Sequence, residues 1–176
     1  MSGRIYEEYK YFSIHPMINL RLTVGLINES YYDWKFTFSG AKETPYDKGL
    51  FFLEAHFPSD YPNSPPEINF ITPIYHMNVN PCAPKNPGEE SLGHVCISTL
   101  NWWNPQYKIR EVLLNIYSLF YMHNVESPYG TERAKEYMED DGCVYFEKIK
   151  KFTEKYANPE SFNNNYDRNQ DWDFTF

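Results

Sequence analysis

The stretch Gly93-His94-Val95-Cys96-Ile97-Ser98 places one cysteine between a glycine and a polar loop, and the chain changes from strand-like to helical periodicity around it. A segment rich in proline and asparagine precedes the stretch, and Trp102-Trp103-Asn104-Pro105 follows it. Further upstream, Tyr75-His76-Met77-Asn78 offers an asparagine whose uncharged amide can donate to an oxygen that gains negative charge when an acyl group is attacked. A thiol and a polarising amide on one long loop predict acyl transfer.

Before this loop, the apolar residues follow the pattern of one short helix and then several strands. Ile5, Tyr9 and Phe12 recur at helical spacing, and His15-Pro16 ends that pattern. Apolar and polar residues then alternate, as in half-buried strands, over residues 20–26, 34–38 and 51–57, with turns at 28–30 and 40–49 and a short fourth strand at 67–70. Consecutive strands with no helix between them predict a four-stranded antiparallel meander.

Beyond the loop, the apolar residues recur at helical spacing. One stripe predicts a helix over about 106–122 that packs on the sheet, and its members are Ile109, Val112, Leu113, Ile116, Leu119 and Phe120. Pro128 and Gly130 end this pattern, Thr131 is a candidate N-cap for a short helix to Met138, and residues 144–156 form a last amphipathic stretch. The predicted class is therefore α+β, with an N-terminal helix, the meander, a long active-site loop and C-terminal helices.

Composition limits the domain count, the compartment and the partners. The 176 residues fit one domain, which we expect over 1–157, followed by a polar, acidic and flexible tail over 158–176. A net charge of −8 weighs against nucleic acid as a partner, and no apolar run is long enough for a membrane helix. The start of the chain lacks a secretory pattern, and three cysteines suit reduced thiols, so we expect the cytoplasm or the nucleus.

Two proline motifs upstream of the cysteine complete a family pattern. Phe57-Pro58-Ser59-Asp60-Tyr61-Pro62 is followed by Pro65-Pro66. With the cysteine and tryptophan motifs, the chain resembles the ubiquitin-conjugating enzymes, whose core carries YP-x-x-PP, an HPN tripeptide, the acceptor cysteine and W-x-P. This sequence departs from the pattern twice, because Met77 replaces the proline of the tripeptide and residues 79–92 exceed the usual connection to the cysteine.

The resemblance implies a function for the central loop. Cys96 would accept ubiquitin or a ubiquitin-like protein from an activating enzyme as a thioester and pass it to a substrate lysine with a RING-type ligase. Asn78 would stabilise the oxyanion or position the loop, and His76 would support the loop structurally. Exchange between two thioesters is nearly even, so a strongly activated thiol is not required. No metal or small cofactor is expected.

The resemblance also implies positions around the thiol. Ser127 falls where the family often has an acidic residue beside the incoming lysine, with Glu126 adjacent, and Tyr75 is expected near the same acceptor pocket. Cys82 and Cys143 are expected to be dispensable for loading. The expected ligase-binding residues are Pro62, Asn63, Trp103, Pro105 and Gln106, and the expected contacts of the activating enzyme are Arg4 and Lys10.

Three other interpretations stay open at this point. A zinc site would use His76, Cys82, His94 and Cys96, although their spacing lacks the short paired clips of such sites. A papain-like hydrolase would use Cys96 with a distant histidine, but the flanking signature is absent. A catalytically inactive relative that only binds ubiquitin would be consistent with Met77 and the long 79–92 segment.

Overall fold

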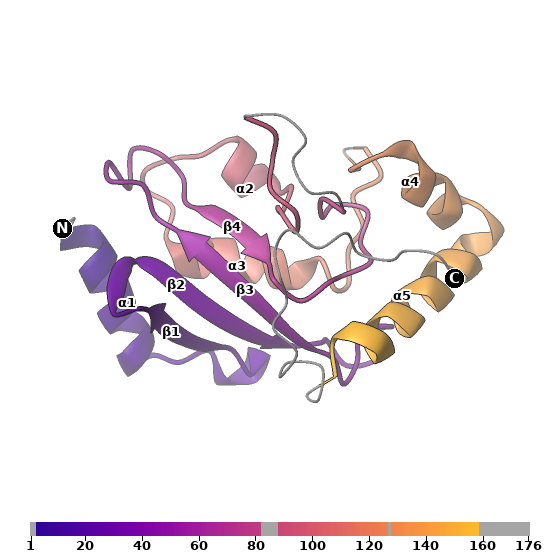
Figure 1. The fold of residues 1–176 in the computed structure, drawn as a ribbon, viewed down its shortest axis with the longest axis horizontal. Helices are drawn as coiled ribbons and strands as arrows, with labels where there is room; N and C mark the ends of the chain where they lie inside the picture. Colours follow the sequence, from indigo (N-terminus) through magenta and orange to yellow (C-terminus); the bar gives the residue numbers. More distant parts are fainter. Residues whose placement is uncertain (1–2, 82–87, 127, 159–176) are drawn as a thin grey trace.

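The computed structural model describes residues 3–81, 88–126 and 128–158. Helix α1 (Gly3–Ile14) and the 3-10 turn η1 (Ile18–Leu20) precede strands β1 (Thr23–Ile27), β2 (Ser30–Ser39), β3 (Leu50–His56) and β4 (Glu67–Phe70). After a long loop come α2 (Ser98–Asn101), α3 (Ile109–Ser118), α4 (Thr131–Met138), η2 (Asp140–Gly142) and α5 (Cys143–Tyr156). The predicted α+β class is confirmed (Figure 1).

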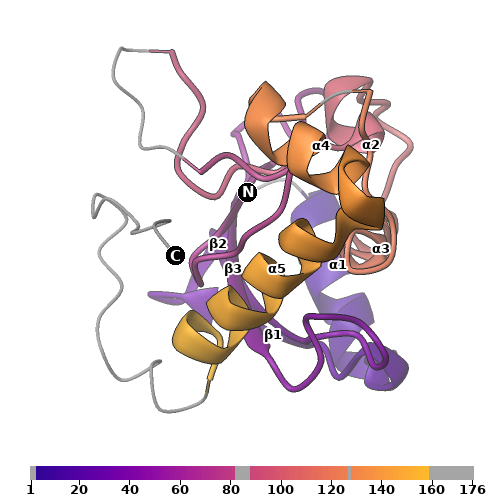
Figure 2. The same ribbon diagram turned by 90° about the vertical axis from the view of Figure 1, so that its right-hand side faces the viewer.

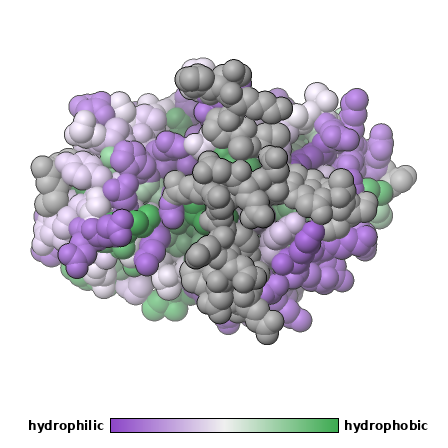
Figure 3. All heavy atoms as spheres, in the orientation of Figure 1, coloured by the Kyte–Doolittle hydropathy of each residue, from purple (hydrophilic) through white to green (hydrophobic). Residues whose placement is uncertain are grey.

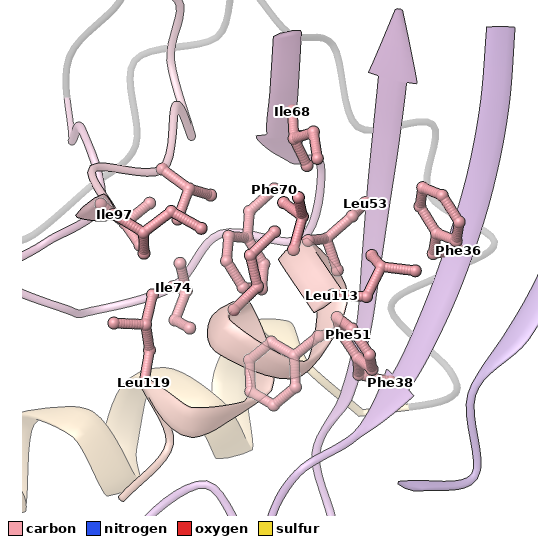
Figure 4. Packing of buried hydrophobic residues seen from close by; sticks show 14 of the residues in the cluster. Phe36, Phe38, Phe51, Leu53, Ile68, Phe70, Ile74, Ile97, Leu113 and Leu119 are labelled. Carbon is pink, nitrogen blue, oxygen red and sulfur yellow. The ribbon is translucent and has the colours of Figure 1, made fainter. Parts of the chain in front are cut away.

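The four strands form one antiparallel sheet in the order β1-β2-β3-β4. Its register places Phe36 opposite Leu53, and Leu53 opposite Phe70, so these side chains share one face. Phe38 lies opposite Phe51 in the same way. These side chains are all buried, and Figure 4 shows how they pack together. The apolar residues that alternate with polar ones in the sequence therefore form the buried face of the sheet.

Helix α3 covers this core face and lies behind the sheet in Figure 1. Its buried stripe contains Ile109, Val112, Leu113 and Ile116, as the helical spacing predicted. Helix α1 lies at one end of the sheet, and α4 and α5 lie together at the other end (Figures 1 and 2). The loop that leads to the cysteine thus starts after the edge strand β4, and its first part contacts the C-terminal helices through Tyr75 and Met77.

Several predicted element boundaries were wrong, and local backbone conformation explains those of the first two strands. The first strand begins at Thr23, because residues 18–20 form η1 and Arg21 adopts a left-handed φ of 46°. The central helix spans 109–118 and continues only as looser turns. Ser30 belongs to β2, since Asn28 and Glu29 alone make the hairpin turn with φ of 50° and 57°.

The start of α4 also differs from the prediction. Thr131 is the first residue of the helix, and Gly130, with a φ of 80°, occupies the N-cap position without a side-chain bond. Thr131 is therefore not the cap, and the positive φ explains why a glycine precedes the helix.

On the face shown in Figure 3, hydrophilic residues predominate toward both ends of the molecule. No helix among the described residues has the length and apolar character needed to cross a membrane. The expected tail lies, except for Asn158, outside the described residues, so the boundary at residue 157 stays a prediction.

Candidate functional site: a cysteine on a braced loop

The backbone of Cys96 is held by a short antiparallel pairing within the long loop. Val79 pairs with Val95, and the Cys96 N–H donates to the Asn78 carbonyl oxygen at 2.9 Å. The pairing continues one residue away, where the Asn80 N–H donates to the His94 carbonyl at 2.9 Å. The segment that carries the cysteine is therefore fixed directly to the segment that carries the asparagine.

Gly93 fixes the same segment to the sheet. Its φ is 78°, and a Cβ at this position would lie 2.1 Å from the Phe70 carbonyl oxygen. That close approach allows the Phe70 N–H to donate to the Gly93 carbonyl at 2.9 Å. Only glycine accommodates both the positive φ and the contact, so the glycine before the cysteine sets the position of the loop against β4.

The thiol itself faces outward. Val95 and Ile97 are buried, whereas His94 and Cys96 are partly exposed, as expected for alternating side chains of an extended segment. The Asn101 side chain donates through Nδ2 to the Cys96 Sγ at 3.3 Å. Asn101 was missed in the sequence analysis, because no motif or periodicity indicates that the last residue of the one-turn helix α2 reaches back to the sulfur.

Asn78 joins the cysteine loop to the loop before α4. Its Nδ2 donates to the Asn124 carbonyl at 2.8 Å, and its Oδ1 accepts from the Asn124 N–H at 2.9 Å. The side chain is fully buried. This paired geometry is what loop positioning requires. It engages one of the two amide hydrogens of Asn78, and donation to an oxyanion would have to come from the other one.

His76 holds the turn from inside the protein. Its Nδ1 accepts from the Asn78 N–H at 3.0 Å, so Nε2 carries the proton and donates to the Leu119 carbonyl at 3.0 Å. Burial and the neighbouring His123 keep the pKa of His76 well below its usual range. The ring is thus neutral with both nitrogens occupied, which suits structural support and does not suit a metal ligand or a general base.

No group of three or more metal-binding side chains converges within the described residues. Cys82, which the zinc interpretation needs, lies outside them. The engaged imidazole of His76 weighs against that interpretation, because a zinc ligand must offer a free ring nitrogen.

Met77 uses a hydrogen bond that proline could not make. Its N–H donates to the Tyr145 hydroxyl of α5 at 3.0 Å, and its carbonyl accepts from the Tyr129 N–H at 2.6 Å. The Met77 side chain is fully buried. Proline restrains a turn covalently and lacks an N–H, whereas here the turn is restrained by a tertiary bond to a C-terminal helix.

Tyr75 packs against the C-terminal helices. Its hydroxyl donates to Glu136 Oε2 of α4 at 2.6 Å, and the Arg133 guanidinium carbon lies 4.3 Å from the centre of its ring. Burial and the bond to Glu136 raise the pKa of Tyr75. The structure therefore assigns Tyr75 firm partners in α4, and its part in an acceptor pocket stays a prediction.

The loop before α4 contains the expected lysine-side position. Ser127 lies outside the described residues. Glu126 is exposed, and its N–H donates to the Asn124 Oδ1 at 3.0 Å. The described part of this loop is therefore organised by Asn124, which Asn78 holds through its backbone.

The two loops expected to bind a ligase lie together. The Trp103 Nε1 donates to the Pro62 carbonyl at 2.7 Å, although 41 positions separate them in the chain. Asn63, Pro105 and Gln106 are exposed around this contact. The structure thus brings all five predicted ligase-binding residues into one region, and their binding role stays a prediction.

The two cations of α1 differ in their surroundings. Lys10 is exposed. Arg4 is partly buried, where it pairs with Glu8 through Nε and donates through Nη2 to the Tyr107 carbonyl at 3.1 Å. Arg4 therefore also has an internal role, and contact of either residue with an activating enzyme stays a prediction.

The chain thus combines an α+β domain with a partly exposed thiol on a loop that a buried His-x-Asn turn braces. Comparison with known proteins identifies the family. The family model described as ubiquitin-conjugating enzyme matches residues 4–153. The E2 domain of a Toxoplasma gondii ubiquitin conjugating enzyme superposes with a TM-score of 0.72 and 26% sequence identity, covering 89% of this chain and 98% of that one. The chain belongs to the ubiquitin-conjugating enzyme family.

Proposed function

We propose that the protein is an active ubiquitin-conjugating enzyme, an acyltransferase that carries its modifier as a thioester on Cys96. It receives ubiquitin or a ubiquitin-like protein from an activating enzyme and transfers it to a substrate lysine with a RING-type ligase, in the cytoplasm or the nucleus. The observation that carries the proposal is the partly exposed thiol on a backbone fixed to both β4 and the Asn78 turn.

Loading is an exchange between two thioesters. The Cys96 sulfur attacks the carbonyl carbon of the thioester on the activating enzyme, a new C–S bond forms, and the original C–S bond breaks. The proton of the Cys96 thiol ends on the departing thiol. Because like bonds are exchanged, the thiol must be accessible rather than strongly activated, which agrees with its partly exposed position.

Transfer to lysine needs stabilisation of negative charge twice. The amine attacks the thioester carbonyl, whose oxygen gains charge, and the collapse of this intermediate expels the Cys96 thiolate as the amine loses a proton. The Asn101 amide, 3.3 Å from the sulfur, is placed to donate to the departing thiolate. Asn78 holds the cysteine loop and the loop before α4 together during both steps, through its two hydrogen bonds to the Asn124 backbone.

An inactive ubiquitin-binding relative is the second candidate, suggested by Met77 in place of proline. The bonds of Met77 to Tyr145 and Tyr129 weigh against this alternative, because they brace the turn without the proline ring.

A loading assay separates the two candidates. Wild type, Cys96→Ala and Cys143→Ser are incubated with an activating enzyme, ATP and ubiquitin, then resolved with and without reductant. We expect a reducible adduct in wild type and in Cys143→Ser, and none in Cys96→Ala. Cys143 is the control because its thiol is exposed in the wild-type protein but lies at the start of α5, outside the active loop. If wild type forms no adduct with ubiquitin, nor with other modifiers and their matching activating enzymes, the inactive relative is the better description.

A further inference from the structure

A carboxylate from the extra 79–92 segment lies beside the active loop. The Tyr129 hydroxyl donates to Glu90 Oε2 in a short hydrogen bond. Both residues are anchored to the turn that holds Asn78, since the Tyr129 N–H donates to the Met77 carbonyl at 2.6 Å and Asn80 Nδ2 donates to the Glu90 carbonyl at 2.9 Å. The pair is therefore positioned by the same backbone that positions the thiol.

The pair lies on the same side of the loop as the thiol. His94 and Cys96 are two residues apart and partly exposed, whereas Val95 between them is buried, so the first two side chains share one face. The His94 Nε2 is 3.7 Å from Glu90 Oε1. Burial and the bond to Glu90 are the main causes that raise the pKa of Tyr129, and the negative charge of a Cys96 thiolate adds to them. The phenol is thus within electrostatic reach of the sulfur.

We propose that Glu90, oriented by Tyr129, receives the lysine amine that attacks the Cys96 thioester. This inference rests on the proposed function and names the acceptor side of that site. Glu90 has about half of its side chain exposed, so an incoming ammonium group can reach its carboxylate. The resemblance placed a serine, Ser127, at the usual acidic position, and Glu90 supplies a carboxylate from a different segment of the chain.

The chemistry of transfer gives the carboxylate a defined task. A lysine side chain is almost entirely protonated near neutral pH, because its ordinary pKa is about 10.4. The Glu90 carboxylate attracts this ammonium and accepts one proton from it, which frees the nitrogen lone pair to form the C–N bond. As the C–S bond breaks, the nitrogen loses its second proton to water and Cys96 leaves as a thiolate. Tyr129 acts as a positioning residue, since its hydroxyl fixes the orientation of the carboxylate.

Single-turnover discharge tests this assignment. Glu90→Gln, Tyr129→Phe and wild type are loaded with ubiquitin, freed of the activating enzyme and ATP, and chased with free lysine or with hydroxylamine. Glu89→Gln is the matched control, because Glu89 is the adjacent exposed carboxylate. Hydroxylamine is uncharged at pH 7, so it needs neither attraction by a carboxylate nor prior loss of a proton.

We expect all four proteins to load to the same extent. Discharge to lysine falls about a hundredfold or more in Glu90→Gln, within the range of a general base, and about threefold in Tyr129→Phe. Glu89→Gln discharges like wild type. In Glu90→Gln the lysine profile moves to higher pH, whereas discharge to hydroxylamine is unchanged in every variant.

Two results would overturn the assignment while leaving the carrier function intact. In the first, Glu90→Gln loads and discharges to lysine at the rate of Glu89→Gln. In the second, Glu90→Gln slows discharge to lysine and hydroxylamine equally, which would place the effect on the thioester rather than on the amine. Failure of wild type to load would instead remove the proposed function, and this assignment with it.

Discussion

At the scale of single residues, the contact between Asn101 and the Cys96 sulfur leads to the first prediction. Asn101→Ala removes an amide donor 3.3 Å from Sγ. A hydrogen bond to a charged group contributes about 1.5 kcal/mol, so we expect single-turnover discharge to slow by roughly tenfold. Alkylation of Cys96 by iodoacetamide at fixed pH should slow as well, because the thiolate loses the same donor.

Asn101→Asp provides the matched control for this prediction. The change keeps the shape of the side chain and replaces the donor by a negative charge close to the sulfur. Both rates should fall further than in Asn101→Ala, since a like charge disfavours the thiolate. Equal alkylation and discharge rates in wild type and Asn101→Ala would show that the contact has no part in the chemistry.

The sequence predicted some residues of this site and not others. Cys96 and its Gly93 were predictable, because a thiol beside a glycine in a polar loop is a local signal. Asn101, Tyr129 and Tyr145 were not, since each reaches the site through tertiary placement of a helix end or a loop. Their sequence neighbours carry no pattern that reports such contacts.

At the scale of elements, the bond between the Met77 N–H and the Tyr145 hydroxyl should account for part of the stability of the turn. Tyr145→Phe leaves the buried N–H without its acceptor, which costs about 1–3 kcal/mol of unfolding free energy. In a Met77→Pro background this N–H does not exist, so the same change should cost about 1 kcal/mol less. Urea unfolding of the two single variants and the double variant measures the coupling, and equal costs in both backgrounds would contradict it.

Elements with a strong repeating pattern were predicted well, and their ends were not. The alternation in β2 and β3 and the stripe of α3 reflect burial on one face, which every residue in the element reports. The end of an element depends on the conformation of single residues. Arg21, for example, separates η1 from β1 because its backbone is left-handed. One such residue has no periodicity from which it could be read.

At the scale of the whole molecule, Glu8 joins three parts of the fold. Its buried carboxylate accepts from the Tyr61 hydroxyl at 2.9 Å and from the Ile109 N–H, the first residue of α3, at 2.7 Å, and it also pairs with Arg4. Glu8→Ala leaves these buried donors unsatisfied and should cost about 3 kcal/mol. Glu7→Ala, on the exposed side of α1, should change stability by less than about 0.5 kcal/mol in the same urea titration. Similar losses in the two variants would mean that Glu8 does not link α1 to α3.

The stability of the molecule should depend on pH through His123. Its ring stacks between His76 and Tyr137, with ring centres 4.8 Å and 5.3 Å away, and its buried Nε2 has no hydrogen-bond partner among the described residues. Burial lowers the pKa of His123 to about 4, from an ordinary value near 6.5. The unfolded chain therefore binds a proton below about pH 6.5 that the folded protein rejects until about pH 4.

Because the folded protein takes up this proton only at a lower pH than the unfolded chain, acid destabilises the fold. The contribution of His123 to stability is fully present above about pH 6.5 and is lost as the pH falls, by about 2 kcal/mol between pH 7.5 and pH 5. His123→Phe keeps an aromatic ring among Tyr137, Tyr145 and Phe146 but cannot take up a proton. Urea unfolding at both pH values should show that the loss between them is about 2 kcal/mol smaller in His123→Phe than in wild type. His76 contributes to the loss in both proteins, and because burial is the larger cause of its lowered pKa, most of that contribution remains when His123 is replaced. An equal loss in the two proteins would place the proton uptake on other groups, and the stacked histidine would then be a packing feature alone.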